Sequence, residues 1–99
     1  MKRVYIEPSA KADVESVFWY YELAHPGLGQ EFKSRIAEAL RRIAEYPGAT
    51  PEIEPGVRWL MLKQFPFKLF YLSEEDPLRV IAVIHAAAAP DTWRRALGS

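Results

Sequence analysis

The chain has 99 residues and no cysteine, and its 13 basic and 13 acidic side chains cancel. The length suits a single domain over residues 1–99, and the lack of cysteine excludes disulfides and cysteine-based zinc sites. A balanced charge excludes a general nucleic-acid binder, whose basic excess is far larger. We find neither a secretion signal nor the roughly 18 consecutive apolar residues of a membrane span, so we expect a cytoplasmic protein without membrane contact.

The first half of the chain predicts one strand followed by two helices. Alternating side chains over Lys2–Glu7 predict the strand, and Ser9 is placed to cap the helix that follows. Apolar residues recur at three- and four-residue intervals over 10–24 and over 28–46, which predicts two amphipathic helices. Only a short segment rich in glycine and proline separates them, so we expect an antiparallel helical hairpin.

The second half predicts three strands and a short helical tail. Residues 47–56 contain three prolines and two glycines, which indicates a loop. Val57–Phe65, Lys68–Leu72 and Leu78–His85 predict strands, and their short connections favour an antiparallel meander. One or two helical turns fit residues 90–97. We therefore expect an α+β fold in the order β-α-α-β-β-β, with an antiparallel sheet packed against the helical hairpin.

No catalytic motif is present in the sequence. It has neither a glycine-rich phosphate loop nor a nucleophile elbow. His25 and His85 have no partner at a metal-ligand spacing, so we expect no metal and no cofactor. His85 ends the most apolar strand and is the better candidate for a general base, although no nucleophile lies near it in the sequence.

Cationic and aromatic residues in the second half give a stronger signal. Cations stabilise charge on a phosphodiester, and aromatic rings stack on bases or anchor protein interfaces. The alternative is that the aromatic residues pack the sheet while the cations face water, and composition alone favours this alternative. The set consists of Arg58, Trp59, Lys63, Phe67, Lys68, Tyr71, Trp93, Arg94 and Arg95.

Several short motifs follow one another in a specific order. They are Ala10 with Ala12 and Asp13, the pair Tyr20-Tyr21, Gly29 with Glu31-Phe32, Ile43–Pro47, Arg58, Phe65–Tyr71, Val80–His85, and Pro90 with Trp93. Over residues 4–95 this order resembles the RelE/ParE superfamily of type II toxin–antitoxin toxins, closest to the ParE branch. The resemblance implies a toxin that a cognate ParD-like antitoxin neutralises in a hetero-oligomer, with operator DNA contacted only through the antitoxin.

The resemblance also implies what the toxin acts on. ParE-like members inhibit DNA gyrase by protein–protein contact, which we favour, and we expect the target or antitoxin contacts at Arg58, Lys63, Lys68, His85 and Trp93. The alternative is a RelE-like, ribosome-dependent mRNA endonuclease, for which Lys63, Lys68 and His85 remain as phosphate or proton-transfer groups. A third reading is an inactive relative that only binds an antitoxin.

Departures from the family pattern weaken the endonuclease alternative. Lys68 stands where the family usually has arginine, so a cation is kept but its bidentate geometry is lost. The family usually continues after His85 with one or two arginines, whereas residues 86–89 are all alanine. Ala88, and after it Ala87, is where arginine is expected. The alanines are either natural variation or a deliberate replacement that reduces toxicity, and the sequence leaves both open.

Overall fold

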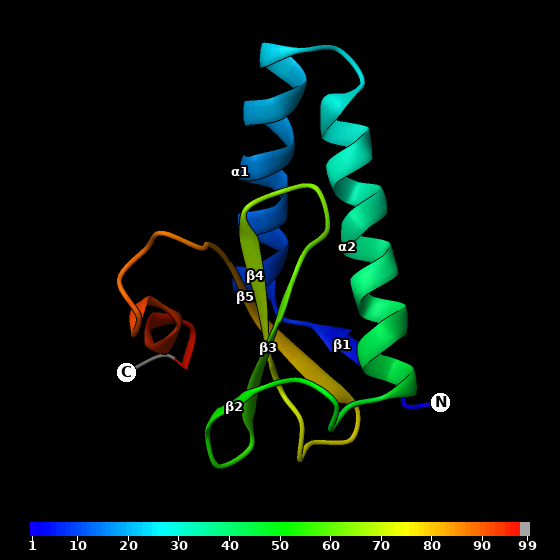
Figure 1. Ribbon diagram of the computed structural model, residues 1–99, viewed down its shortest axis with the longest axis vertical. Helices are drawn as coiled ribbons and strands as arrows, with labels where there is room; N and C mark the ends of the chain where they lie inside the picture. Colours follow the sequence, from blue (N-terminus) through cyan, green and yellow to red (C-terminus); the bar gives the residue numbers. More distant parts are fainter. Residues whose placement is uncertain (98–99) are drawn as a thin grey trace.

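A computed structural model describes residues 1–97 of the chain. Its elements are β1 (Val4–Ile6), α1 (Pro8–Ala24), α2 (Leu28–Glu45), β2 (Glu52–Glu54), β3 (Val57–Met61), β4 (Phe67–Leu72), β5 (Leu78–His85) and the 3₁₀ helix η1 (Thr92–Leu97). The strands form a sheet in the order β1-β5-β4-β3-β2. The helical hairpin of α1 and α2 packs on one face of this sheet, and η1 packs on the other face (Figure 1).

The predicted α+β fold is confirmed, and the differences lie at the edges of the sheet. β1 runs parallel to β5, so the sheet is mixed; the connection between them contains both helices and is long enough for a parallel crossover. β2 lies inside the predicted loop 47–56, because Gly56, with a φ of 81°, turns the chain back onto β3. The predicted strand 57–65 ends early at Met61, and Gln64 in the following loop has a φ of 72°.

β5 is buried on both faces and is paired on both sides, with β1 and with β4. The β5 strand bulges at Ile81, where its register against β4 shifts by one residue. As a result Ile81 and Ala82 both pack toward η1, while Val80 and Val83 both pack toward the helical hairpin. An extra residue of this kind breaks strict alternation, and here it lets one strand supply both apolar cores.

The side of β5 that continues past β1 is closed by α1. Ser9 donates its hydroxyl to the carbonyl of Ile81 at 2.9 Å. The backbone N–H of Val83 donates to a carboxylate oxygen of Asp13, also at 2.9 Å. The prediction that Ser9 caps α1 is wrong, because the helix begins at Pro8 and Ser9 already lies within it. Two side chains from the start of α1 therefore form hydrogen bonds with backbone groups of β5 that would otherwise lie unpaired at an open edge of the sheet.

The turn of the helical hairpin is held by Glu22 of α1. Its carboxylate accepts hydrogen bonds from the backbone N–H groups of Gly27 and Gly29, at 2.9 and 3.0 Å. Those amides open α2, where the positive end of the helix dipole favours a negative charge. Gly27 has a φ of 94°, a left-handed conformation that glycine adopts without strain.

Gly29 lies where the two helices touch, and it gives a test of this packing. An added Cβ would lie 2.7 Å from the carbonyl oxygen of Phe18 and 2.9 Å from the Cβ of Glu22. We expect Gly29→Ala to lower the free energy of unfolding by about 1–3 kcal/mol, because the helices must separate. Urea unfolding followed by circular dichroism measures this change. Gly48→Ala is the matched control, since a Cβ there meets nothing within 4 Å, and equal losses in both variants would contradict the close approach.

Candidate functional site

Two of the residues predicted to contact a partner are engaged within the chain itself. The guanidinium of Arg58 donates to the carbonyl of Thr50 and lies 3.6 Å from the carboxylate of Glu52, so it ties β2 and the preceding loop to β3. The ammonium of Lys63, in the loop between β3 and β4, lies 3.6 Å from the carboxylate of Glu38 on α2. Both cations hold segments of the fold together, and a contact with a partner stays a prediction for each.

Lys68 lies on the side of β3, β4 and β5 that faces away from the helical hairpin, here called the open face. Its ammonium is 4.5 Å from the ring centroid of Trp59, a cation–π arrangement that orients both side chains. Met61 lies beside Lys68 in the pairing of β3 with β4 and is 42% exposed. This part of the open face therefore presents a cation, an aromatic ring and a thioether together.

Trp93 reaches the open face from η1 but offers little surface to a partner. Its side chain is 3% exposed and stacks on Phe70 of β4, with ring centroids 6.3 Å apart and planes 18° apart. The next residue, Arg94, pairs with Glu54 of β2. Trp93 thus anchors η1 to the sheet, and its predicted contact with a partner is untested.

The alanine run after β5 forms a turn beside Lys68. The N–H of Ala88 donates to the carbonyl of His85 at 3.0 Å, which closes the turn. Ala88 borders a hollow of about 20 Å³ that Lys68 also lines, whereas Ala87 is exposed and does not border it. An arginine side chain at position 88 would therefore start next to Lys68, which distinguishes the two positions that the sequence left open.

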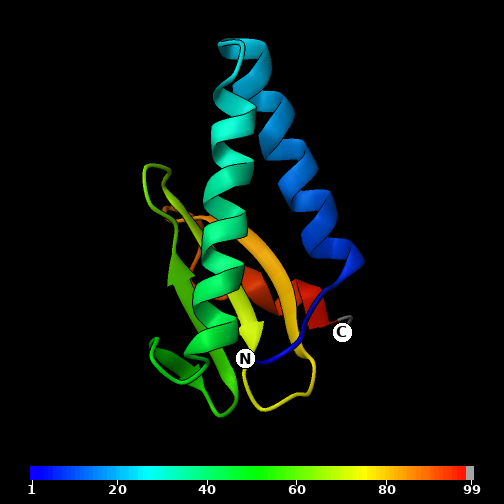
Figure 2. The same ribbon diagram turned by 90° about the vertical axis from the view of Figure 1, so that its right-hand side faces the viewer.

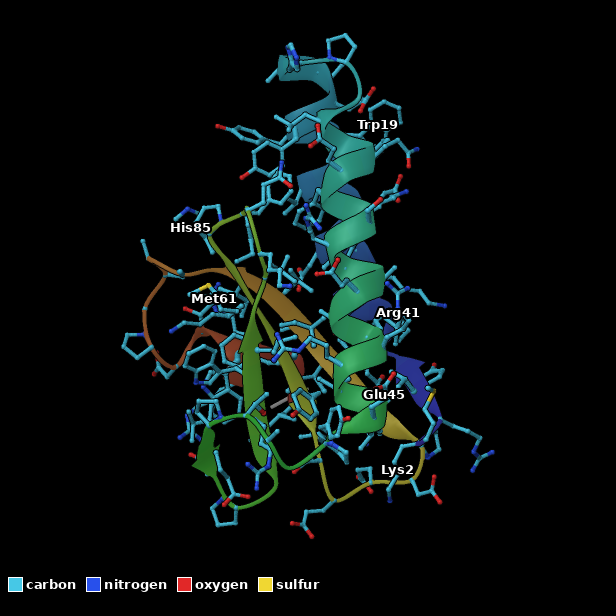
Figure 3. The ribbon with its side chains drawn as sticks, turned by 45° about the vertical axis from the view of Figure 1, so that its right-hand side comes forward. Lys2, Trp19, Arg41, Glu45, Met61 and His85 are labelled. Atoms are coloured by element: carbon cyan, nitrogen blue, oxygen red, sulfur yellow. The ribbon has the colours of Figure 1, made fainter. Side chains whose placement is uncertain are left out.

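His85 points toward the helical hairpin, on the opposite side of the sheet from Lys68. Lys68 pairs in register with Ile84, so the next side chain projects to the other face. The His85 ring packs edge-on against Phe67, with centroids 5.2 Å apart, at the end of the sheet nearest the hairpin tip (Figure 3). It borders a hollow of about 350 Å³ against α1, and the full lining is Ser16, Val17, Tyr20, Tyr21, Phe67 and His85.

The arrangement of these side chains bears directly on the two predicted activities. Phosphodiester cleavage needs a proton-transfer group within hydrogen-bond reach of the nucleophile and a cation beside the same phosphate. His85 faces the hairpin, Lys68 faces away from it, and Lys63 is paired with an acidic residue of α2. The three residues proposed for an endonuclease therefore do not converge on one point.

The outer surface of α1 is apolar near the hairpin tip. Trp19, Tyr20 and Leu23 are 50%, 72% and 80% exposed. The hairpin extends past the end of the sheet, so the sheet leaves this part of α1 uncovered (Figure 2). Ala12 and Ser16 continue the side marked by Tyr20 and Leu23, at helical spacing, and we call these four residues the α1 stripe. No member of the stripe carries a charge.

α2 provides the contrast that makes the α1 stripe unusual. Its exposed positions carry no large apolar side chain, and Arg41 and Glu45 project outward from it (Figure 3). The sequence carried a signal for this difference, since apolar residues of α1 are not confined to one face. The apolar spacing predicts two amphipathic helices and does not distinguish them in this respect. Large apolar side chains gathered on a surface mark a site of interaction.

The two histidines lie apart and do not combine with other ligands. His25 follows the end of α1 and is exposed, and His85 ends β5. Within residues 1–97, no three histidine, aspartate or glutamate side chains are grouped so as to hold a metal ion.

No helix in the described part of the chain combines the length and the apolar character needed to cross a membrane.

Asp13 is half-buried in a cleft of about 230 Å³ between α1, β5 and η1. Thr92 and Arg95 border this cleft from the η1 side. Burial raises the pKa of the Asp13 carboxyl above its ordinary value of 3.8, although the hydrogen bond from Val83 lowers that pKa in part. The folded chain therefore binds this proton more tightly than the unfolded chain does.

The raised pKa of Asp13 predicts how stability changes with pH. Between 3.8 and the raised pKa the folded state holds more protons, so the contribution of Asp13 to stability falls as pH rises through this window. Asp13→Asn keeps an oxygen for the Val83 N–H but cannot ionise. We expect the unfolding free energy of the unmodified chain, relative to that of Asp13→Asn, to decrease across this window. Urea unfolding between about pH 3 and 7 measures it, and a pH-independent difference would contradict the stated direction.

Comparisons with known proteins agree with this architecture. Residues 4–90 match the family model described as the ParE toxin of the type II toxin–antitoxin system parDE. Among solved structures, the fold is similar to that of a chain from the chromosomal ParDE toxin–antitoxin system of P. aeruginosa. The TM-score is 0.74 and the sequence identity 19%, and the match covers 86% of this chain and 96% of that chain. A comparison with curated proteins finds no match.

Proposed function

The chain belongs to the ParE toxin family of type II toxin–antitoxin systems, and from this premise we propose that it binds a cognate ParD-like antitoxin and inhibits DNA gyrase by protein–protein contact. One observation carries the proposal: the chain has two surfaces of different chemistry on opposite sides of its sheet. The α1 stripe is uncharged and its large side chains are Tyr20 and Leu23, whereas the open face around Lys68 carries a cation over an aromatic ring. Two surfaces of different chemistry can serve two different protein partners.

The α1 stripe is the surface that fits the antitoxin. An antitoxin segment that is disordered alone can order itself on an apolar helix surface and cover it. Burying a large side chain contributes about 1.5–3 kcal/mol, so covering Tyr20 and Leu23 would add measurably to the affinity for an antitoxin. The same exposure predicts that the isolated chain is less soluble than its complex with the antitoxin.

The double variant Tyr20→Ser/Leu23→Ser tests the antitoxin surface. We expect its affinity for the cognate antitoxin to fall at least about tenfold, because two large side chains lose their contacts. We also expect the isolated variant to be more soluble than the unmodified chain. Isothermal titration calorimetry measures the affinity. Arg41→Ser, on the polar side of α2, is the control, and an unchanged affinity in the double variant would place the antitoxin elsewhere.

The open face around Lys68 is the surface that fits the target. Tryptophan, tyrosine and arginine are enriched among the residues that dominate the binding energy of protein interfaces, and Trp59 lies here with the ammonium of Lys68 over its ring. The turn formed by Ala88 and its neighbours borders the same hollow as Lys68. A binding inhibitor needs no acid–base pair, which agrees with the separation of Lys68 from His85.

Gyrase supercoiling and DNA-cleavage assays on the unmodified chain and on Ala88→Arg test the target. We expect both to trap cleaved DNA, with Ala88→Arg acting at a roughly 10- to 100-fold lower concentration, because a second cation beside Lys68 adds a charged hydrogen-bond donor. Ala87→Arg, which adds the same charge outside the hollow, is the matched control. If none of the three proteins inhibits gyrase, the proposed target is wrong. Ribosome-dependent mRNA cleavage that falls on Lys68→Ala would then support the endonuclease alternative.

A further inference from the structure

His85 stands between the two proposed surfaces. Among the described residues it alone borders both the hollow against α1 and the hollow beside Lys68. Its ring lies on the helix side of the sheet, while the backbone that follows it crosses to the open face. His85 thus borders both of the surfaces that we assign to partners.

The ring of His85 forms part of the surface on the helix side of the sheet. It packs against Phe67 at an interplanar angle of 78° and shares its hollow with Tyr20 and Tyr21. Tyr20 is also part of the α1 stripe, so the hollow is continuous with the surface assigned to the antitoxin. His85 is exposed, so part of its surface is available to a partner.

The Nδ1 atom of His85 forms a hydrogen bond with the turn on the open face. It accepts a hydrogen bond from the N–H of Ala87 at 3.0 Å, and this bond bridges the start of the turn. The alanine side chains of residues 86–89 have no polar atom with which to hold the turn themselves. Backbone hydrogen bonds, the Nδ1 acceptor at the start of the turn and the Thr92 hydroxyl, which donates to the Ala89 carbonyl at its end, therefore hold the turn in shape. This shape keeps Ala88 beside Lys68.

We propose that His85 is a positioning residue with two separable uses: its ring packs against the antitoxin, and its Nδ1 acceptor holds the Ala86–Ala89 turn in the shape that the target binds. The inference rests on the proposed function, because it assigns one partner to each side of the sheet. It goes beyond that function in giving one side chain a distinct chemical role toward each partner.

Two substitutions separate these uses. His85→Phe keeps a flat ring against Phe67 but has no acceptor for the Ala87 N–H. His85→Asn loses the ring but keeps an acceptor, because an asparagine side-chain oxygen accepts from the N–H two residues ahead in an Asx turn. Since His85 is exposed, both variants should fold, and equal thermal unfolding midpoints would verify this.

Amide hydrogen exchange, measured by NMR on the isolated chain, tests the positioning role directly. We expect exchange at Ala87 to become about 2- to 10-fold faster in His85→Phe, the effect of losing one neutral hydrogen bond. In His85→Asn it should stay within about twofold of the unmodified chain. The N–H of Ala86, which donates to Pro66, is the internal reference. Unchanged exchange at Ala87 in His85→Phe would overturn the proposal, whether or not the chain inhibits gyrase.

Binding measurements with the same variants test the two uses against each other. We expect His85→Phe to lose about fivefold in gyrase inhibition and His85→Asn to restore it, since the loss follows the acceptor. We expect the reverse order for affinity to the cognate antitoxin, where His85→Asn is the weaker binder. Equal effects of the two variants on both partners would overturn the division of roles. Absence of gyrase inhibition by the unmodified chain would instead refute the proposed function, and the exchange comparison would still decide the role of Nδ1.

Discussion

The structure depends on the burial of β5 on both of its faces. A strand in this position must offer apolar side chains to the helical hairpin and to η1 at once, and the bulge at Ile81 makes this possible by placing Ile81 and Ala82 on the same side. Burial also requires that the backbone of β5 be satisfied where no neighbouring strand continues. Ser9 and Asp13 of α1 form these hydrogen bonds, so the start of the first helix is fixed against the last strand.

The sequence predicted the helices and strands well where the apolar periodicity is strong. It failed where a contact between distant parts of the chain determines the local structure. The two helices and the strands after residue 57 have clear apolar patterns, and the structure confirms their order. β2 lies between Pro51 and Pro55, and local composition favours a loop there. It pairs with β3 because the chain turns back at Gly56, and Arg58 contacts Glu52 across that turn. The bulge at Ile81 is equally hidden, because a fully apolar strand shows no alternation that could reveal an extra residue.

The same limit applies to the candidate site. The sequence identified cations and a histidine in the second half, but it could not say which of them share a face. The register of β4 with β5 places Lys68 and His85 on opposite sides, and Lys63 turns back to α2 instead of joining either. The family pattern directed attention to positions 87 and 88. Only the shape of the turn shows that position 88 is the one beside Lys68.

Trp93 shows why the choice of residue matters in testing such a site. It is the largest side chain of the core on the open face, and its stacking on Phe70 fixes η1 to the sheet. Truncating a buried aromatic of this size costs about 3–5 kcal/mol, a large fraction of the stability of a chain of this length. Loss of activity after such a change would therefore report unfolding rather than contact. Lys68 and Ala88, which border the same hollow without filling the core, can be changed without that ambiguity.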